Sequence, residues 1–219
     1  GNVIICMHGR GQVVSRDAAG KQTVLAAKYQ GKRLNSPNDL AWRKNGDLYF
    51  TDPPYGFAKQ DDDPKKELKF NGIYRLRNGK LDLLYKDMTR PNGIAFTPDE
   101  KFLYVANSDP ARKLWNKFPV KEDGTLGAPV VLADVTAETA DGLPDGLKVD
   151  KAGNLFATGP GGVWVYSPEG KLLGKIQPDE VPANVGFADD GKTLYMTART
   201  SVYRIRLNTA GTLPGEFWK

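Results

Sequence analysis

The sequence predicts an all-β fold, a β-propeller built from repeated four-stranded units. A short pattern recurs four times along the 219 residues: a turn with proline and an Asn or Asp, an apolar alternation, a polar turn with glycine, and a second strand. Hairpin signals join two further strands to two of these units. Repeats of this length indicate stacked or radial supersecondary units. Four short strands per unit are typical of a propeller blade, and helical periodicity of useful length is missing.

The turn that opens each unit carries a side chain with an oxygen. These opening residues are Asn38, Asn92, Asp145 and Asn184. In a ring of blades such turns lie at one mouth of the central channel, so the pattern predicts that their oxygens converge there. Asn and Asp are also common in turns for purely structural reasons, because they bond their own backbone. A turn role alone therefore remains the alternative for each of them.

The second half of a unit is clearest in two places. Residues 72–76 and 81–85 flank one hairpin turn, and residues 162–166 and 171–176 flank another. Residues 61–67 interrupt the pattern with a run of charges, which predicts a solvated insertion on the surface.

The N-terminal residues resemble the second half of a unit. Gly1–Cys6 matches residues 46–50, and no Pro-Asn turn precedes it. We count four complete blades and most of a fifth, and this incomplete blade runs from Gly1 to about Tyr29. Because an open ring leaves sheet edges exposed, the expectation is one propeller domain over residues 1–219, incomplete at its N-terminus. A segment upstream of Gly1 would close the ring.

Composition narrows the classes of partner. Lys and Arg number 31 against 26 Asp and Glu, a net charge of +5, and the basic residues are scattered. A nucleic-acid reader would gather them into a stripe, so a nucleic-acid partner is not expected. No run approaches the roughly 20 apolar residues of a membrane span. The sequence thus predicts a soluble protein, cytoplasmic or periplasmic, that acts on a small molecule.

The residue inventory also limits the chemistry. Cys6 is the single cysteine and His8 the single histidine, so a serine or cysteine triad has little material. Cys6 lies in an apolar strand and is predicted to be an inert thiol. Carboxylate and amide oxygens, in contrast, are hard ligands that suit calcium, magnesium or manganese. The repeated openings therefore favour a metal site over a nucleophile.

Several long runs carry a resemblance to a known family. They are Gly31–Asp39, Tyr49–Gly56, Arg90–Phe96, Leu143–Asp150 and Ala157–Val163. In this order they resemble the gluconolactonase branch of the senescence marker protein, gluconolactonase and luciferin-regenerating enzyme family. The likeness extends from Cys6 to about Leu207.

The resemblance implies a six-bladed propeller with one catalytic divalent metal in its channel, of which this chain supplies about five blades. It implies that Asn92 and Asp145 are metal ligands, and that Asn38 lies beside the metal as a substrate contact or an extra ligand. Asp39 matches an Asp that assists proton transfer. The family's third ligand, a Glu in a Glu-Gly-Pro motif, has no counterpart here, and we expect it in the upstream segment.

Three other positions bear on substrate binding. His8 stands in Met7-His8-Gly9 where relatives often read Glu-His-Gly, and it is predicted to contact substrate, with a structural hydrogen bond as the alternative. Tyr55 is predicted to line the pocket, with packing as the alternative. Ser36 occupies the place of an Arg in animal sugar lactonases, so sugar recognition through that Arg is not implied.

Together these features predict metal-dependent hydrolysis of a small lactone, with Asp145 or Asp39 moving the proton. Calcium is favoured as the ion, and zinc, manganese and iron are alternatives. Two other readings stay open. One is a non-catalytic binding or scaffold propeller. The other is a metal-independent enzyme of the strictosidine-synthase type, against which the Pro-Asn-Gly and Pro-Asp-Gly turns argue.

Overall fold

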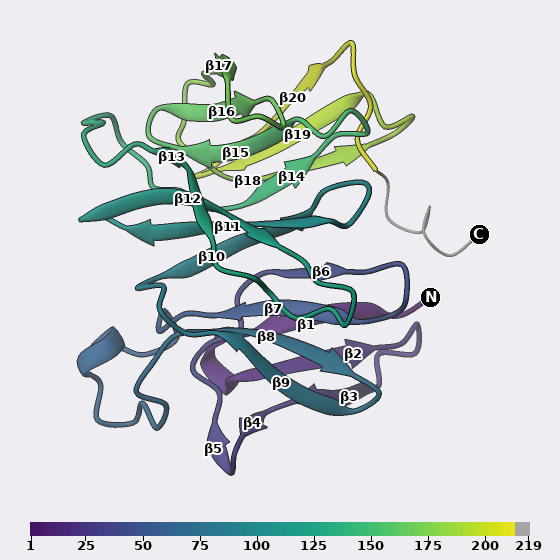
Figure 1. Cartoon of the computed structure of the whole chain (residues 1–219), viewed down its shortest axis with the longest axis vertical. Coiled ribbons are helices and arrows are strands. Elements are labelled where there is room, and N and C mark those ends of the chain that lie inside the picture. Colours follow the sequence, from purple (N-terminus) through teal and green to yellow (C-terminus); the bar gives the residue numbers. More distant parts are fainter. Residues whose placement is uncertain (213–219) are drawn as a thin grey trace. The chain divides into compact units, whose positions relative to one another are not determined.

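The computed structural model describes residues 1–212 and contains strands and two short 3-10 turns, so the prediction of an all-β chain is confirmed (Figure 1). The chain divides into two compact units, Gly1–Asn92 and the residues from Gly93 onward. The boundary falls inside one strand, β10 (Pro91–Phe96).

The first unit holds two antiparallel sheets and a small two-stranded ribbon. Their orders are β1-β2-β3, β6-β7-β8-β9 and β4-β5. The strands are β1 (Val3–Met7), β2 (Gln12–Arg16), β3 (Gln22–Ala26), β4 (Lys28–Tyr29), β5 (Lys32–Arg33), β6 (Leu40–Trp42), β7 (Leu48–Asp52), β8 (Gly72–Arg77) and β9 (Lys80–Tyr85). The 3-10 turns are η1 (His8–Arg10) and η2 (Gln60–Asp62).

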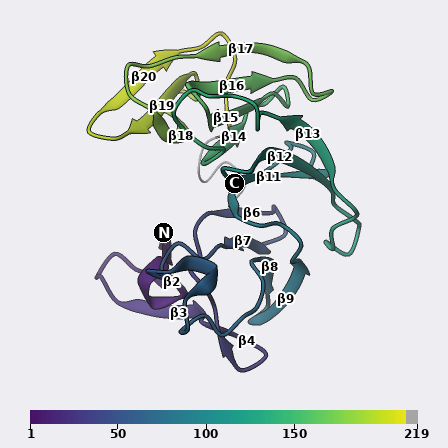
Figure 2. The same ribbon diagram turned by 90° about the vertical axis from the view of Figure 1, so that its left-hand side faces the viewer.

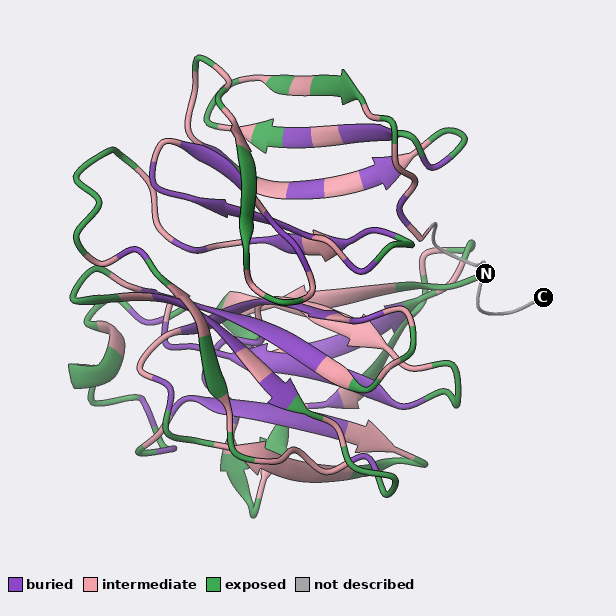
Figure 3. Ribbon diagram, turned by 45° about the horizontal axis from the view of Figure 1, so that its top comes forward, coloured by how far each residue is buried: buried purple, intermediate pink, exposed green. Residues whose placement is uncertain are grey.

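One apolar core joins the two sheets of this unit. It includes Val13 of β2 and Phe50 of β7, and the rings of Phe50 and Tyr74 stack with centroids 5.3 Å apart. Every residue of β7 is buried, whereas β9 is only half-buried apart from its exposed first residue (Figure 3). The second strand of the sheet is therefore its best-protected element, which fixes the residues at its carboxyl end.

The second unit holds three antiparallel sheets, with orders β10-β11-β12-β13, β14-β15-β16-β17 and β18-β19-β20 (Figure 2). Besides β10, the strands are β11 (Phe102–Asp109), β12 (Arg112–Pro119), β13 (Val130–Asp134), β14 (Leu147–Val149), β15 (Leu155–Gly159), β16 (Gly162–Tyr166), β17 (Leu172–Ile176), β18 (Pro182–Ala188), β19 (Thr193–Ala198) and β20 (Val202–Arg206). Aromatic rings fill the space between the first two sheets: Trp115 is fully buried, and its ring lies 6.0 Å from that of Trp164.

Each sheet follows chain order from one strand to the next, as in a propeller blade, and the two predicted hairpins are confirmed as β8–β9 and β16–β17. The described residues thus supply five blades. The sixth blade, the closed ring and the single domain over 1–219 stay predictions. Within residues 1–212, we find no helix that is long and apolar enough to cross a bilayer.

The prediction that residues 61–67 form a solvated insertion is wrong in part. Asp61 and Asp62 are exposed, but the side chain of Lys66 is only 5% exposed. Its ammonium group donates hydrogen bonds to the carbonyl oxygens of Leu68 (2.8 Å) and Phe70 (3.3 Å). Because a buried ammonium group needs acceptors, these two carbonyls explain how the segment can turn inward.

The alignment of Asn184 with the other opening residues is also corrected, by one position. Val149 pairs with Leu155 in one sheet and Phe187 pairs with Leu194 in another. Counting back from these pairs makes Asn184 equivalent to Gly146 and Ala183 equivalent to Asp145. The turn from Phe187 to Leu194 is one residue longer than the turn from Val149 to Leu155, and this extra residue displaces the asparagine by one position in the sequence comparison.

Candidate functional site

Three predicted site residues form a chain of hydrogen bonds in the first unit. Asn38 Nδ2 donates to Asn92 Oδ1 over 2.5 Å, and Asn38 Oδ1 lies 3.1 Å from His8 Nε2. His8 comes from η1, Asn38 from the extended segment before β6, and Asn92 from β10. Asn92 is 5% exposed, while Asn38 and His8 are half-buried. Segments far apart in sequence thus bring three polar side chains together.

Thr51 of β7 holds the two asparagines at this distance. Its carbonyl accepts the N–H of Asn38 (2.9 Å), and its N–H donates to the carbonyl of Asp39 (3.0 Å). Its hydroxyl donates to the carbonyl of Asn92 (2.7 Å). Because Thr51 is fully buried on a strand that is itself buried, both asparagine backbones are fixed to one rigid element.

The hydrogen bond to Asn38 selects one tautomer of His8. An amide oxygen can only accept, so Nε2 of His8 is the donor in this bond. In that tautomer of the neutral imidazole, Nδ1 is an acceptor and lies on the other side of the ring.

A buried carboxylate supports the segment that leads to Asn38. Asp52 is 0% exposed and accepts the N–H groups of Asn35 (2.8 Å) and Ser36 (2.7 Å), one on each oxygen. Burial raises the pKa of Asp52 to about 7, although these two donors and the charges of Lys66 and Arg33 act in the opposite direction. Asp52 is a structural element of the site that the sequence reasoning did not single out.

Ser36 has a structural contact within the first unit. It is fully buried, and its hydroxyl accepts the N–H of Gly56 over 2.7 Å. A Cβ on Gly56 would stand 2.6 Å from the carbonyl oxygen of His8, so the chain passes close to the histidine at this point. Tyr55, which precedes Gly56, is half-buried. The predicted contact of Tyr55 with substrate stays a prediction.

A hollow of about 520 Å³ adjoins this region of the first unit. Two of its lining residues, Gly9 and Gly56, directly follow His8 and Tyr55 in the sequence. The residues that line it are Gly9, Arg33, Gly56, Phe57, Pro64, Lys65 and Glu67. Arg33 closes one side of it, because its guanidinium donates to the carbonyls of Leu34 and Asn35 (both 2.8 Å) and lies 4.9 Å from the centre of the Phe57 ring.

Asp39 follows Asn38, and Oδ1 of its carboxylate accepts the N–H of Leu40 over 2.8 Å.

Burial, with smaller contributions from the negative charges of Asp39 and Asp52, raises the pKa of Cys6 to about 12. Cys6 is therefore a neutral thiol near pH 7, as expected for an inert residue.

The remaining predicted residue, Asp145, belongs to the second unit. It is half-buried, and its N–H donates to the carbonyl of Thr158 over 3.2 Å, as that of Asn38 does to Thr51. Glycines pack tightly around its backbone: a Cβ on Gly93 would stand 2.2 Å from the carbonyl oxygen of Asp145. The hydroxyl of Thr158 also donates to the carbonyl of Gly146 over 2.9 Å, so the main chain around Asp145 is firmly held.

The structure brings together His8, Asn38 and Asn92, with Asp39 adjacent in the chain. Within residues 1–212 no three His, Cys, Asp or Glu side chains form a metal-binding group. The predicted metal ligands are mainly amide oxygens of asparagine, and a group of His, Cys, Asp and Glu side chains would not include them. The roles assigned to Asn38, Asp39, Asn92 and Asp145 remain predictions.

Comparison with known proteins decides the family. Residues 1–200 match the SMP-30/Gluconolactonase/LRE-like region. The chain belongs to this family. The resemblance seen in the sequence is thereby confirmed.

Individual relatives agree with this assignment. The chain is 40% identical over 220 residues to a gluconolactonase from Zymomonas mobilis, covering 96% of this chain and 62% of that protein. A solved gluconolactonase structure from Xanthomonas campestris superimposes with a TM-score of 0.83 at 34% identity, covering 94% of this chain and 68% of that one. A regucalcin from Agrobacterium tumefaciens, described as calcium-binding, shares the fold with a TM-score of 0.76 at 20% identity, over 96% of this chain and 74% of its own.

This chain spans only part of the curated relatives it matches: 62% of the Zymomonas mobilis protein and 49% of a lactonohydrolase, oryL, from Aspergillus oryzae, to which it is 25% identical over 88% of its own length. The activity of the whole protein is therefore a proposal.

Proposed function

We propose that this chain is part of a lactone hydrolase that uses a divalent metal ion. The family and the 40% identity to a gluconolactonase support the reaction class. The observation that carries the proposal is the row of hydrogen bonds through His8, Asn38 and Asn92. In it, the two asparagine side chains lie within 2.5 Å of each other beside a histidine. A propeller core rarely needs three adjoining polar side chains for packing alone.

The residues present suit an oxygen-liganded ion in their chemistry. Asn38 and Asn92 offer neutral amide oxygens, and Asp145 would add one negative charge from the second unit. Such a set of hard donors fits calcium best, with zinc, manganese and iron as alternatives. When bound, a divalent ion would polarise the lactone carbonyl and lower the pKa of a water molecule.

The side chains of this chain would then handle the proton and the substrate. Water adds to the carbonyl carbon of the lactone, the ring C–O bond breaks, and the released alkoxide takes a proton to give a hydroxy acid. Asp145 is the preferred group to accept the proton of the water and to return it. Asp39 is a second candidate, although the N–H of Leu40 already occupies one of its oxygens.

His8 and Asn38 would orient the substrate. The bond from His8 Nε2 to Asn38 Oδ1 fixes the amide of Asn38, and the free Nδ1 of His8 can accept a hydrogen bond from a substrate hydroxyl. Tyr55, beside the hollow, would limit the size of the ring that enters.

The Asp145→Asn variant tests this proposal. It keeps the shape and one oxygen but removes the charge and the basicity, so we expect lactone hydrolysis by the complete protein to fall by roughly 100-fold or more. Asp39→Asn should lose less. The assay uses a panel of five- and six-membered lactones, with circular dichroism as the control for folding. A wild-type rate in a folded Asp145→Asn variant would support a binding propeller instead.

A further inference from the structure

The charged segment of the first unit begins with a side chain that has several partners. Asp61 lies on η2, and its Oδ1 accepts a hydrogen bond from Asn71 Nδ2 over 2.9 Å. Its Oδ2 is 3.1 Å from both Nε and one terminal nitrogen of Arg90. The ammonium group of Lys66 lies 3.5 Å from Oδ1. One carboxylate therefore contacts three side chains, of which that of Arg90 is 29 residues away in sequence.

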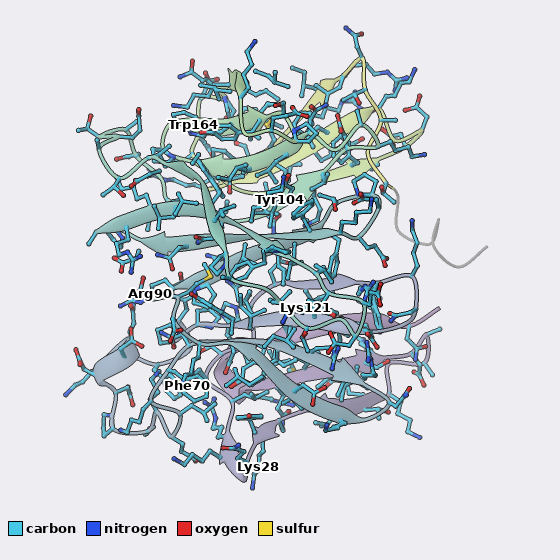
Figure 4. All side chains as sticks on the ribbon, in the orientation of Figure 1. Lys28, Phe70, Arg90, Tyr104, Lys121 and Trp164 are labelled. Atoms are coloured by element: carbon cyan, nitrogen blue, oxygen red, sulfur yellow. The ribbon has the colours of Figure 1, made fainter. Side chains whose placement is uncertain are left out.

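One arm of this network leads to Asn92. Arg90 also donates to the side-chain oxygen of Gln60, so η2 engages its guanidinium through two neighbouring residues. Only Pro91, whose φ angle is fixed by its ring, separates Arg90 from Asn92. A side chain held at several points, followed by a stiff residue, leaves Asn92 little freedom. Figure 4 labels Arg90 at this place, together with Phe70 from the same unit.

The other arm leads to Asn38. Asn71 accepts at its Oδ1 from Asn35 Nδ2 over 3.1 Å, and Asn35 is fully buried. The same nitrogen of Asn35 lies 2.9 Å from the carbonyl oxygen of Phe70. Asp52 then holds the main chain at Asn35 and Ser36, two and three residues before Asn38.

Charge explains why this network is sensitive to a single change. Lys66 is buried at 5% exposure, and besides two carbonyls it has the carboxylate of Asp61 beside it. Removing that charge leaves Lys66 and Arg90 with less compensation, and uncompensated buried charge is costly. The bonds of Arg90 and Asn71 would then rearrange around Asp61.

We propose that Asp61 is a positioning residue that sets the spacing between Asn38 and Asn92, a role that rests on the lactonase activity proposed above. The carboxylate fixes Arg90 on one side and, through Asn71, Asn35 on the other. The two asparagine side chains depend on both. A displacement on the order of 1 Å between catalytic groups can lower a rate about 100-fold, so loss of Asp61 should lower kcat more than it changes KM.

The test compares Asp61→Asn with Asp62→Asn in the complete protein. Asp62 is the neighbour of Asp61 on the same 3-10 turn and is exposed as Asp61 is, so it controls for a change of charge in this segment. We expect kcat for lactone hydrolysis to fall about tenfold to 100-fold in Asp61→Asn, with KM within about threefold, and to stay near wild type in Asp62→Asn. Arg90→Lys, which keeps a charge but loses the forked geometry, should lie between them.

A second readout does not depend on activity. In protein labelled with ¹⁵N-asparagine, the side-chain amide resonances of Asn38 and Asn92 should shift in Asp61→Asn and Arg90→Lys but not in Asp62→Asn. Unchanged resonances and an unchanged kcat in folded Asp61→Asn would overturn the positioning role. If the wild-type protein opens no lactone, the proposed function fails, and the resonances alone decide whether Asp61 positions the two asparagines.

Discussion

The two units hold their predicted site residues in different ways. In the first unit, buried side chains do this: Asp52 accepts two main-chain N–H groups ahead of Asn38, and Thr51 ties Asn38 to Asn92. In the second unit, Gly93 packs against the carbonyl oxygen of Asp145, and the buried hydroxyl of Thr158 donates to the carbonyl of the next residue, Gly146. The first arrangement depends on a buried carboxylate and its hydrogen bonds, whereas the second combines hydrogen bonds with close packing against a glycine.

This difference determines which changes each unit tolerates. A polar network responds to pH and to the removal of one partner, since an unpaired buried group is costly. A glycine contact responds to added volume, and its response is independent of pH. The same kind of turn can therefore fail for opposite reasons in the two units.

The largest effect should come from Gly93→Ala. Its Cβ would stand 2.2 Å from the carbonyl oxygen of Asp145 and 2.9 Å from Cα of Gly146, so the backbone must move. We expect a loss of about 3 kcal/mol in the free energy of unfolding, measured by urea denaturation. Gly186→Ala is the matched control, because nothing lies within 4 Å of its Cβ. Equal stabilities of the two variants would contradict the claim that close packing at Gly93 holds Asp145 in place.

A smaller, pH-dependent effect should arise from Asp52 in the first unit. Its pKa in the folded protein is raised from 3.8 to about 7, so the folded state binds more protons than the unfolded state between these values. Stability from this group is therefore present below about pH 4, falls as pH rises, and is lost by about pH 7. The charges that face it are those of Lys66 and Arg33.

The measurement is the stability difference between wild type and Asp52→Asn at two pH values. Relative to the variant, wild type should be more stable at about pH 5 than at about pH 8, by on the order of 2 kcal/mol. Gly93→Ala, measured in parallel, should show no such change. A pH-independent difference for Asp52→Asn would mean that Asp52 is ionised throughout this range.

The smallest effect is expected for Asn184→Ala. Oδ1 of Asn184 accepts the neighbouring N–H of Val185 over 2.8 Å, the same local bond that Asp39 makes with Leu40. We expect a loss of about 1 kcal/mol in stability and lactone hydrolysis within about twofold of wild type. A large loss of activity would restore Asn184 as a site residue and contradict the corrected alignment.

Sequence reasoning predicts well those features that local pattern controls. Apolar alternation and glycine turns fix β8–β9 and β16–β17, and the Pro-Asn pairs locate Asn38 and Asn92, although Asn92 lies inside β10 and not in a turn before it. The error at Asn184 has a local cause as well, because the turn after Phe187 is one residue longer than its counterpart after Val149. The strands β12 and β13 were not predicted as such, since β12 alternates weakly and carries charges.

The residues that hold the site residues in place could not be predicted from the sequence, because their roles depend on contacts between residues that are distant in it. Asp61 and Lys66 read as a solvated charge run, and only folding brings them to Arg90 and Asn71. Asp52 gives a weak signal, a carboxylate that follows three apolar residues and Thr51 and precedes two prolines. Charged residues at the end of a buried strand are the positions to examine for such support.

The most direct test of the account is the rate at which the complete protein opens a lactone after treatment with a chelator and again after divalent ions are added. Elemental analysis would verify each state, and calcium, zinc, manganese and ferrous iron would be added separately. The account predicts loss of hydrolysis on removal and recovery with at least one ion, and no recovery in Asp145→Asn. A full rate in metal-free protein, or no hydrolysis in any state, would contradict it.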